Sequence, residues 1–203
     1  GSGQYIILIP GGFKPPTGGH YSMIKEYEKK PDVMKVYVVT GPKEREGVTL
    51  DQSKQIFKIY GGFSSKVEFI EAGDATPLTT CYKLMENDHF VSEHAGGIFS
   101  LGAGDKGNDP KRIKDFVKST TAQITAYSAA ETLTVDGHPA SASRMREAFK
   151  NGDWETFKKL LPNDSFYDDV VQVLNKQGSG VNESFFLTGH LFSLVDEVIL
   201  EGK

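Results

Sequence analysis

The residues best suited to chemistry lie in a short glycine- and proline-rich loop near the start of the chain. Residues 10–20 read Pro-Gly-Gly-Phe-Lys-Pro-Pro-Thr-Gly-Gly-His, between an apolar run typical of a buried strand and a segment with helical character. Glycines let an anion approach the backbone, and the first turn of a helix offers N–H groups with partial positive charge. Thr17 and His20 add a hydroxyl and an imidazole. The loop therefore predicts a phosphate site, with a structural turn whose histidine helps to cap a helix as the alternative.

A second pattern of this kind lies far along the chain, at residues 140–146, which read Ala-Ser-Ala-Ser-Arg-Met-Arg. Ser141 and Ser143 stand before and at the start of an expected helix, where hydroxyl and N–H groups can hold phosphate oxygens. Arg146 can pair with the charge of those phosphates. The alternative is that Ser143 is only a helix N-cap and that the arginines form a solvated face.

Other chemistries find less support in the sequence. The first loop matches neither the G-x-G-x-x-G nor the G-x-x-x-x-G-K-[ST] spacing, and no G-x-S-x-G motif occurs. His89 and His94 stand five residues apart without a nearby pair of ligands, so no dedicated metal site is expected. Cys81 has no motif around it and is expected to be a small buried residue.

Strands and helices alternate along the part of the chain that must position these residues. The expected strands cover residues 5–9, 33–40, 67–70, 97–102 and 123–127, and the expected helices cover residues 21–30, 49–60, 80–87, 109–118, 143–150 and 153–161. This order predicts an α/β domain over residues 4–172, a doubly wound, Rossmann-like parallel sheet of five strands with helices on both faces. Ligands of such sheets bind beyond the carboxyl ends of the strands, where the glycine-rich loop lies.

Two segments fall outside this domain. Residues 1–3 are interpreted as a cloning remnant, and residues 173–184 as a polar linker rich in glycine and serine. In residues 185–203, apolar residues recur at helical spacing among acidic ones, which predicts a C-terminal amphipathic helix. Such a helix could dock on its own domain, on a second copy of the chain or on a protein partner.

Composition narrows the class of protein further. The 203 residues are 38% hydrophobic and 25% charged, with a formal net charge of −4, which argues against wholesale binding of nucleic acid. No apolar run approaches the ~18 to 20 residues that span a bilayer, and the start lacks a leader, so no membrane association is expected. The single cysteine favours a reducing compartment, and we expect a cytoplasmic protein.

Both polar patterns resemble motifs of one family. Gly12-Phe13-x-Pro15-x-Thr17-x-Gly19-His20 resembles the (H/T)xGH motif of the nucleotidyltransferase superfamily, which includes phosphopantetheine and nicotinamide mononucleotide adenylyltransferases and cytidylyltransferases. Residues 140–146 resemble the ISSTxxR signature of the same superfamily, in the order and near the end of the domain where it is expected. Position 14 is Lys where many relatives have Asp or Gln, and a lysine there could itself contact phosphate.

The resemblance implies a role for each matching residue. It implies that His20 and Thr17 are catalytic, that the nucleotide phosphates are bound by Gly12, Phe13, Gly19, Ser141, Ser143 and Arg146, and that Lys43 and Arg45 contact the acceptor. Lys14 departs from the family pattern and is a third catalytic candidate because its charge could contact phosphate. It implies no metal ligands from the protein, because Mg²⁺ would arrive with the nucleotide.

The implied reaction is transfer of a nucleoside monophosphate from a nucleoside triphosphate to a phosphorylated small molecule, with release of pyrophosphate. ATP is the expected nucleotide, because the threonine variant of the first motif resembles that of the adenylyltransferases. Two alternatives stay open. One is a cytidylyltransferase that uses CTP and a phosphorylated alcohol or sugar, and the other is a binding module that keeps the nucleotide pocket without turnover.

Overall fold

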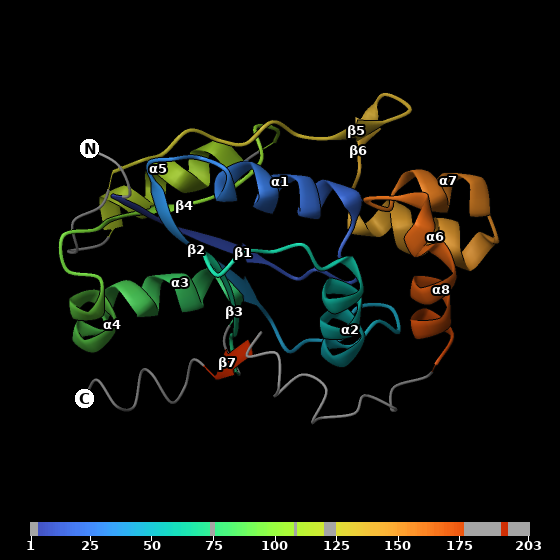
Figure 1. Cartoon of the computed structure of the whole chain (residues 1–203), viewed down its shortest axis with the longest axis horizontal. Coiled ribbons are helices and arrows are strands. Elements are labelled where there is room, and N and C mark those ends of the chain that lie inside the picture. The colour runs from blue at the N-terminus through green and yellow to red at the C-terminus, as the bar shows by residue number, and fades with distance from the viewer. Residues whose placement is uncertain (1–3, 74–75, 108, 120–124, 177–191, 195–203) are drawn as a thin grey trace.

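The computed structural model describes residues 4–73, 76–107, 109–119, 125–176 and 192–194. Its centre is a parallel sheet with four predicted strands in the order β4-β1-β2-β3 (Figure 1). The strands are β1 (Tyr5–Gly11), β2 (Val33–Thr40), β3 (Val67–Glu71) and β4 (Ile98–Leu101). The chain moves outward from β1 to β3 and then returns to the other side of β1, so the order reverses beside β1. Sheets of this kind bind ligands at such a switch point.

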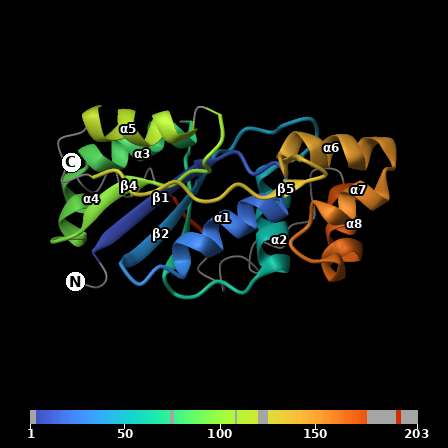
Figure 2. The ribbon, with the colours of Figure 1, turned by 90° about the horizontal axis from the view of Figure 1, so that it is seen from above.

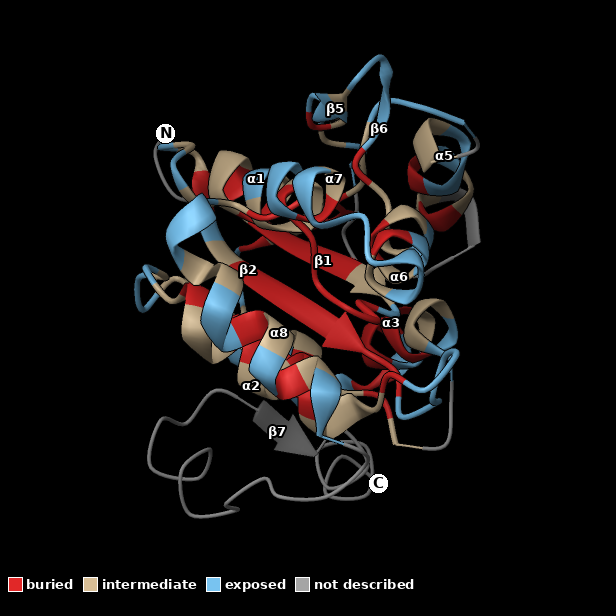
Figure 3. Ribbon diagram, turned by 90° about the vertical axis from the view of Figure 1, so that its right-hand side faces the viewer, coloured by how far each residue is buried: buried red, intermediate tan, exposed pale blue. Residues whose placement is uncertain are grey.

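Successive residues of β1 pack into two different cores, which explains the continuous apolar run. Ile6 and Leu8 pack with α3 (Pro77–Glu86), α4 (Asp88–Glu93) and α5 (Asp109–Ser119). Ile7 and Ile9 pack on the other face with α1 (Gly18–Glu28) and α2 (Leu50–Tyr60). Figure 2 shows α1 and α2 on one side of the sheet and α3 and α5 on the other, and Figure 3 shows that β1 and β2 are largely buried between the helices. The predicted covering of both faces by helices is confirmed.

A third core lies beyond the carboxyl ends of the strands. It joins α2 to a group of helices at one end of the molecule, at the right in Figure 1. These helices are α6 (Ala142–Asn151), α7 (Trp154–Lys159) and α8 (Tyr167–Asn175), with the 3₁₀ turn η1 (Asp164–Phe166) before α8. A small hairpin, β5 (Thr134–Val135) with β6 (His138–Pro139), precedes α6. The helix group therefore faces the glycine-rich loop across the end of the sheet.

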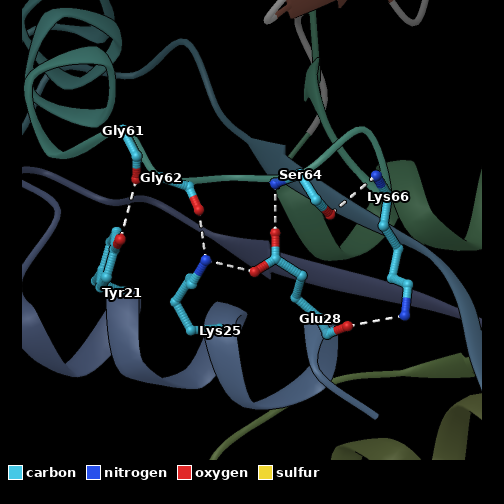
Figure 4. A network of polar contacts seen from close by, with 7 residues as sticks. All are labelled: Tyr21, Lys25, Glu28, Gly61, Gly62, Ser64 and Lys66. Carbon is cyan, nitrogen blue, oxygen red and sulfur yellow. Dashed lines mark hydrogen bonds and ion pairs between the residues drawn. The ribbon is translucent and has the colours of Figure 1, made fainter. Parts of the chain in front are cut away.

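A polar network fastens α1 to the segment between α2 and β3 (Figure 4). The Tyr21 hydroxyl donates to the carbonyl of Gly61 at 3.0 Å, and the Lys25 ammonium pairs with Glu28 at 2.5 Å. The other Glu28 oxygen accepts from the backbone N–H of Ser64 at 2.6 Å. These contacts fix α1 from Tyr21 to Glu28 and so hold the direction in which its N-terminus points at the site.

The prediction of a fifth strand at residues 123–127 is wrong for its described part, residues 125–127, and residues 123–124 lie outside the described chain. Thr125 and Tyr127 make isolated hydrogen bonds to β4, from their N–H groups to Phe99 O and Ser100 Oγ. The Tyr127 hydroxyl donates to Asp32 at 2.6 Å, and the segment runs beside β4 without forming a ladder with it. A short apolar run alone could not reveal that difference.

The prediction for the C-terminal segment also needs correction. Residues 173–175, assigned to the linker, belong to α8, and residues 177–184 lie outside the described chain. Within the expected helix at 185–203, the described residues form β7 (Phe192–Leu194), which pairs in parallel with β3, and the others lie outside the described chain. Over three residues, Phe-Ser-Leu fits a strand as well as a helix, so the helical spacing of the whole segment could not reveal β7. Among the described helices, none is both long and apolar enough to cross a lipid bilayer.

Candidate active site

The two polar segments meet around one cavity of about 590 Å³ at the carboxyl end of the sheet. Gly11 and Thr40 are register partners at the ends of β1 and β2, so the loops that follow these strands start side by side. The N-terminal turns of α3 and α6 complete the wall. The cavity is lined by Gly12, Phe13, Lys14, His20, Gly41, Pro42, Lys43, Arg45, Thr76, Pro77, Ala142, Ser143 and Arg146.

The carbonyl groups of the glycine-rich loop are held from outside the cavity. The Tyr60 hydroxyl donates to Pro16 O at 2.7 Å, and the Ser53 hydroxyl donates to Phe13 O. Both donors belong to α2, which therefore clamps the loop. Phe13 adopts a left-handed backbone (φ 51°), and the Lys14–Pro15 peptide bond is cis. Because two side chains of α2 hold its carbonyl groups, the shape of the loop depends on α2 as much as on its own glycines.

Thr17 and His20 form a capping box at the N-terminus of α1. The Thr17 hydroxyl accepts from the backbone N–H of His20 at 3.2 Å, and His20 Nδ1 accepts from the backbone N–H of Thr17 at 3.0 Å. Because Nδ1 accepts a hydrogen bond, the neutral imidazole carries its hydrogen on Nε2. Burial lowers the pKa of His20 to about 4, so the ring is neutral at pH 7. His20 lines the cavity as well as capping the helix, and the cap fixes a tautomer that can donate to an anion.

Thr17 and Gly19 lie behind the cavity wall. Thr17 is fully buried, and its hydroxyl donates to Ala140 O at 2.7 Å while accepting two N–H bonds from α1. A Cβ atom at Gly19 would stand 2.8 Å from the same Ala140 oxygen, so only glycine allows this close approach. These two residues join the first polar segment to the second. The structure does not bring Thr17 or Gly19 to the cavity surface.

Lys14 is a buried cation in the cavity wall. Only 3% of the residue is exposed, and its ammonium donates to Gly12 O at 2.7 Å and to Gly41 O at 2.9 Å. It therefore ties the loop after β1 to the segment after β2. Burial lowers the pKa of Lys14 to about 8, so the group is mainly protonated at pH 7.

The residues of the second polar segment have three different roles: one caps α6, one holds the β5–β6 hairpin and others line the cavity. Ser141, rather than Ser143, is the N-cap of α6, and its hydroxyl accepts from the backbone N–H of Arg144 at 3.3 Å. The hydroxyl of Ser143 lies 3.1 Å from that of Ser141, and of these two serines Ser143 lines the cavity. Arg144 braces the β5–β6 hairpin by donating to three of its carbonyls.

Arg146 reaches across the site to two other elements. Its guanidinium donates to Lys14 O at 2.7 Å and, through Nε, to the carboxylate of Glu46 at 2.6 Å. The hydrogen bond and charge of Arg146 lower the pKa of Glu46. Sequence reasoning did not select Glu46, although Gly47 beside it is typical of a turn.

Lys43 and Arg45 follow β2 and line the cavity opposite the glycine-rich loop. Thr76 and Pro77 at the start of α3, which the sequence did not single out, border the same space. The cavity therefore gathers cationic side chains and helix N-termini, an arrangement suited to a polyanion. Among the described residues, no group of three or more His, Cys, Asp or Glu side chains could hold a metal ion.

Comparisons with known proteins agree on the fold. No family model and no curated protein sequence matches the chain. The nicotinic acid mononucleotide adenylyltransferase of Plasmodium falciparum, complexed with APC, matches with a TM-score of 0.57 at 15% identity, over 84% of this chain and 94% of that one. A bifunctional NMN adenylyltransferase/ADP ribose pyrophosphatase of Francisella tularensis, complexed with AMP and a manganese ion, matches with a TM-score of 0.53 at 14% identity. That match covers 86% of this chain and 50% of the other.

At these identities the likeness establishes a shared fold. The chain shares with these two structures an α/β fold in which helices flank a parallel sheet.

Proposed function

We propose that this protein is a nucleotidyltransferase that transfers a nucleoside monophosphate from a nucleoside triphosphate to a phosphorylated small molecule. ATP is the favoured nucleotide. An oxygen of the acceptor phosphate attacks the α-phosphorus and forms a new P–O bond. The bond from the α-phosphorus to the oxygen that bridges to the β-phosphorus breaks, and its electron pair leaves with pyrophosphate. No covalent enzyme intermediate is needed.

The observation that carries this proposal is the convergence of Lys14, His20, Ser143 and Arg146 on one cavity. These residues come from two segments more than a hundred positions apart, and each presents a hydrogen-bond donor suited to phosphate. The reaction moves negative charge from the α-phosphate to the leaving pyrophosphate, so fixed donors around the triphosphate lower its barrier. Catalysis of this kind is positioning and charge stabilisation.

Each residue then has a distinct task. His20, neutral and protonated on Nε2, donates a hydrogen bond to the α-phosphate as its charge develops. Lys14 supplies a shielded positive charge at the loop. Ser143 and Arg146 hold the β- and γ-phosphates, and Lys43 and Arg45 attract the phosphate of the acceptor. Mg²⁺ enters as part of the metal–nucleotide substrate.

A turnover screen tests the proposal. ATP, CTP, GTP and UTP are each combined with nicotinamide mononucleotide, a pantetheine phosphate and phosphorylated alcohols and sugars, and pyrophosphate is detected. We expect release with ATP and one acceptor class. Release with CTP alone would identify the cytidylyltransferase, and nucleotide binding without pyrophosphate from any pair would identify a binding module.

We predict that Gly12→Ala weakens nucleotide binding without weakening the fold. A Cβ atom at Gly12 would meet no other atom within 4 Å, and Gly12 lines the cavity, so the added methyl group occupies space that the ligand needs. We expect about a tenfold loss of ATP affinity, or about 1.4 kcal/mol, by calorimetric titration. The melting temperature should stay at the wild-type value. Wild-type ATP affinity in this variant would show that Gly12 is not part of the surface that binds the nucleotide.

We predict an alkaline limb in the pH profile of kcat/KM that belongs to Lys14. The group is a cation below its pKa of about 8 and neutral above it, so its charge, and the activity that depends on it, is lost as pH rises through 8. Profiles between pH 7 and 10 should fall with one deprotonation in the wild type. In Lys14→Gln the activity should be lower and this limb should disappear. A limb that persists in Lys14→Gln belongs to another group.

A further inference from the structure

The two side chains of the Glu46–Arg146 ion pair differ in their exposure to solvent. The Arg146 side chain is 13% exposed, whereas the Glu46 side chain is 71% exposed, and Nε and Oε2 lie 2.6 Å apart. The arginine is thus a shielded part of the wall, and the carboxylate reaches it from the solvent side. An exposed carboxylate can leave such a pair at little cost because water replaces its partner.

A strained two-residue turn presents the Glu46 side chain. Arg45 and Val48 exchange backbone hydrogen bonds of 3.0 and 2.9 Å, and both residues between them have positive φ, 48° at Glu46 and 88° at Gly47. Turns of this type favour Asn or Gly at the first position, and a left-handed backbone costs a residue with a Cβ about 1 kcal/mol. A non-glycine residue held in this region beside a binding site points to a functional constraint on the side chain.

The ion pair stands where two cavities meet. Arg146 and Ser143 line the 590 Å³ cavity of the proposed nucleotide site, and they also line a neighbouring cavity of about 1090 Å³. Glu46 borders this larger cavity, together with Glu44, Glu147 and Lys150. A polyphosphate chain that extends from the first cavity toward the second must therefore meet Arg146 with its Nε edge already occupied by Glu46.

We propose that Glu46 competes with the outer phosphates of the nucleotide for the guanidinium of Arg146 and so weakens the binding of polyphosphates at this site. A carboxylate carries one negative charge, whereas the β- and γ-phosphates of a nucleoside triphosphate together carry about three, so they displace Glu46 from the guanidinium. A ligand with a single phosphate at the α position does not extend to Arg146 and leaves the ion pair closed. This inference rests on the proposed function, because it concerns the arginine assigned to the β- and γ-phosphates.

Titrations of Glu46→Gln with ATP, AMP and inorganic tripolyphosphate test this proposal. Removing the competing carboxylate should tighten ATP and tripolyphosphate binding about 3- to 10-fold, the scale expected for losing a partly exposed ion pair and one nearby negative charge. AMP affinity should change by less than about twofold.

Glu44→Gln is the matched control. Glu44 is exposed and lines the same larger cavity, and within the described part of the chain no hydrogen bond or ion pair joins it to Arg146. Glu44→Gln removes the same charge from the same loop as Glu46→Gln. Because Glu44 does not contact Arg146, we expect its replacement to change ATP and tripolyphosphate affinity clearly less than Glu46→Gln does. Equal gains in the two variants would show a general charge effect and would overturn the proposal.

The Arg146 Nε–Hε signal in a ¹⁵N spectrum provides a second readout. It should shift in Glu46→Gln without ligand, and in the wild type it should shift with tripolyphosphate but hardly with AMP. Unchanged or weaker tripolyphosphate binding in Glu46→Gln would overturn the inference even if the enzyme releases pyrophosphate. Tighter tripolyphosphate binding without pyrophosphate release from any substrate pair would instead overturn the proposed function alone. Failure of ATP and tripolyphosphate to bind any form of the protein would overturn both.

Discussion

Replacing His20 by alanine is expected to lower turnover about 100-fold or more, because it removes a donor to the charge that develops on the α-phosphate. The expectation rests on the tautomer that the Thr17 N–H imposes and on the position of the ring in the cavity wall. Steady-state pyrophosphate release measures it. Turnover near the wild-type rate would remove His20 from the catalytic role.

The control for this variant must separate capping from catalysis, because alanine also removes the acceptor for the Thr17 N–H. Loss of a helix cap typically costs about 0.5 to 2 kcal/mol of stability. His20→Gln keeps an acceptor at the third position of the capping box, where glutamine is a favoured residue. We expect this variant to unfold near the wild-type temperature and still to turn over slowly. Recovery of turnover in His20→Gln would show that the imidazole itself is not required, because glutamine restores the cap and also carries an N–H donor.

Arg146→Ala is expected to weaken ATP binding much more than AMP binding. Its proposed partners are the β- and γ-phosphates, which AMP lacks, and a charged hydrogen bond to phosphate contributes about 1.5 to 3 kcal/mol, or roughly 10- to 150-fold in affinity. AMP affinity should stay within about twofold of the wild type. Parallel titrations of the two nucleotides measure the difference.

The alanine variant also loses the hydrogen bond from Arg146 to Lys14 O, so a general loosening of the loop must be distinguished. Arg146→Lys keeps the positive charge but cannot offer the paired donors of a guanidinium. We expect its ATP affinity to lie between those of the wild type and Arg146→Ala. Equal losses for ATP and AMP in either variant would mean that Arg146 shapes the loop without binding the outer phosphates.

The strands could be predicted well where the residue pattern fits a strand and no other structure. Each of the four strands from β1 to β4 is a compact apolar run, and β2 has the bounds that its β-branched residues predict. Thr49 and Gln52 form the capping box of α2, and a threonine followed three residues later by glutamine is the sequence signature of that cap. The predictions failed at the described residues 125–127 and 192–194, because short apolar runs fit strand, helix or extended chain equally well.

The candidate site could be predicted only in part, because sequence patterns name residues but not their partners. Both polar segments were selected, and the structure brings Lys14, His20, Ser143 and Arg146 to one cavity. Thr17 was expected at the phosphate site, but its hydroxyl donates to Ala140 O. This contact depends on packing between segments 123 residues apart. The partner of Arg146 was equally hidden, because Glu46 stands 100 residues away in a loop that resembles any solvated turn.

The most direct test of nucleotidyl transfer follows the oxygen atoms of the acceptor phosphate. The acceptor that gives the most pyrophosphate is prepared with ¹⁸O in its phosphate and incubated with unlabelled nucleotide, and the products are analysed by mass spectrometry and ³¹P NMR. If the acceptor attacks the α-phosphorus, the condensed product keeps all the label, including the new bridging oxygen, and the pyrophosphate contains none. Label in a released phosphate or pyrophosphate, or release of ADP or unlabelled AMP in place of the condensed product, would contradict nucleotidyl transfer.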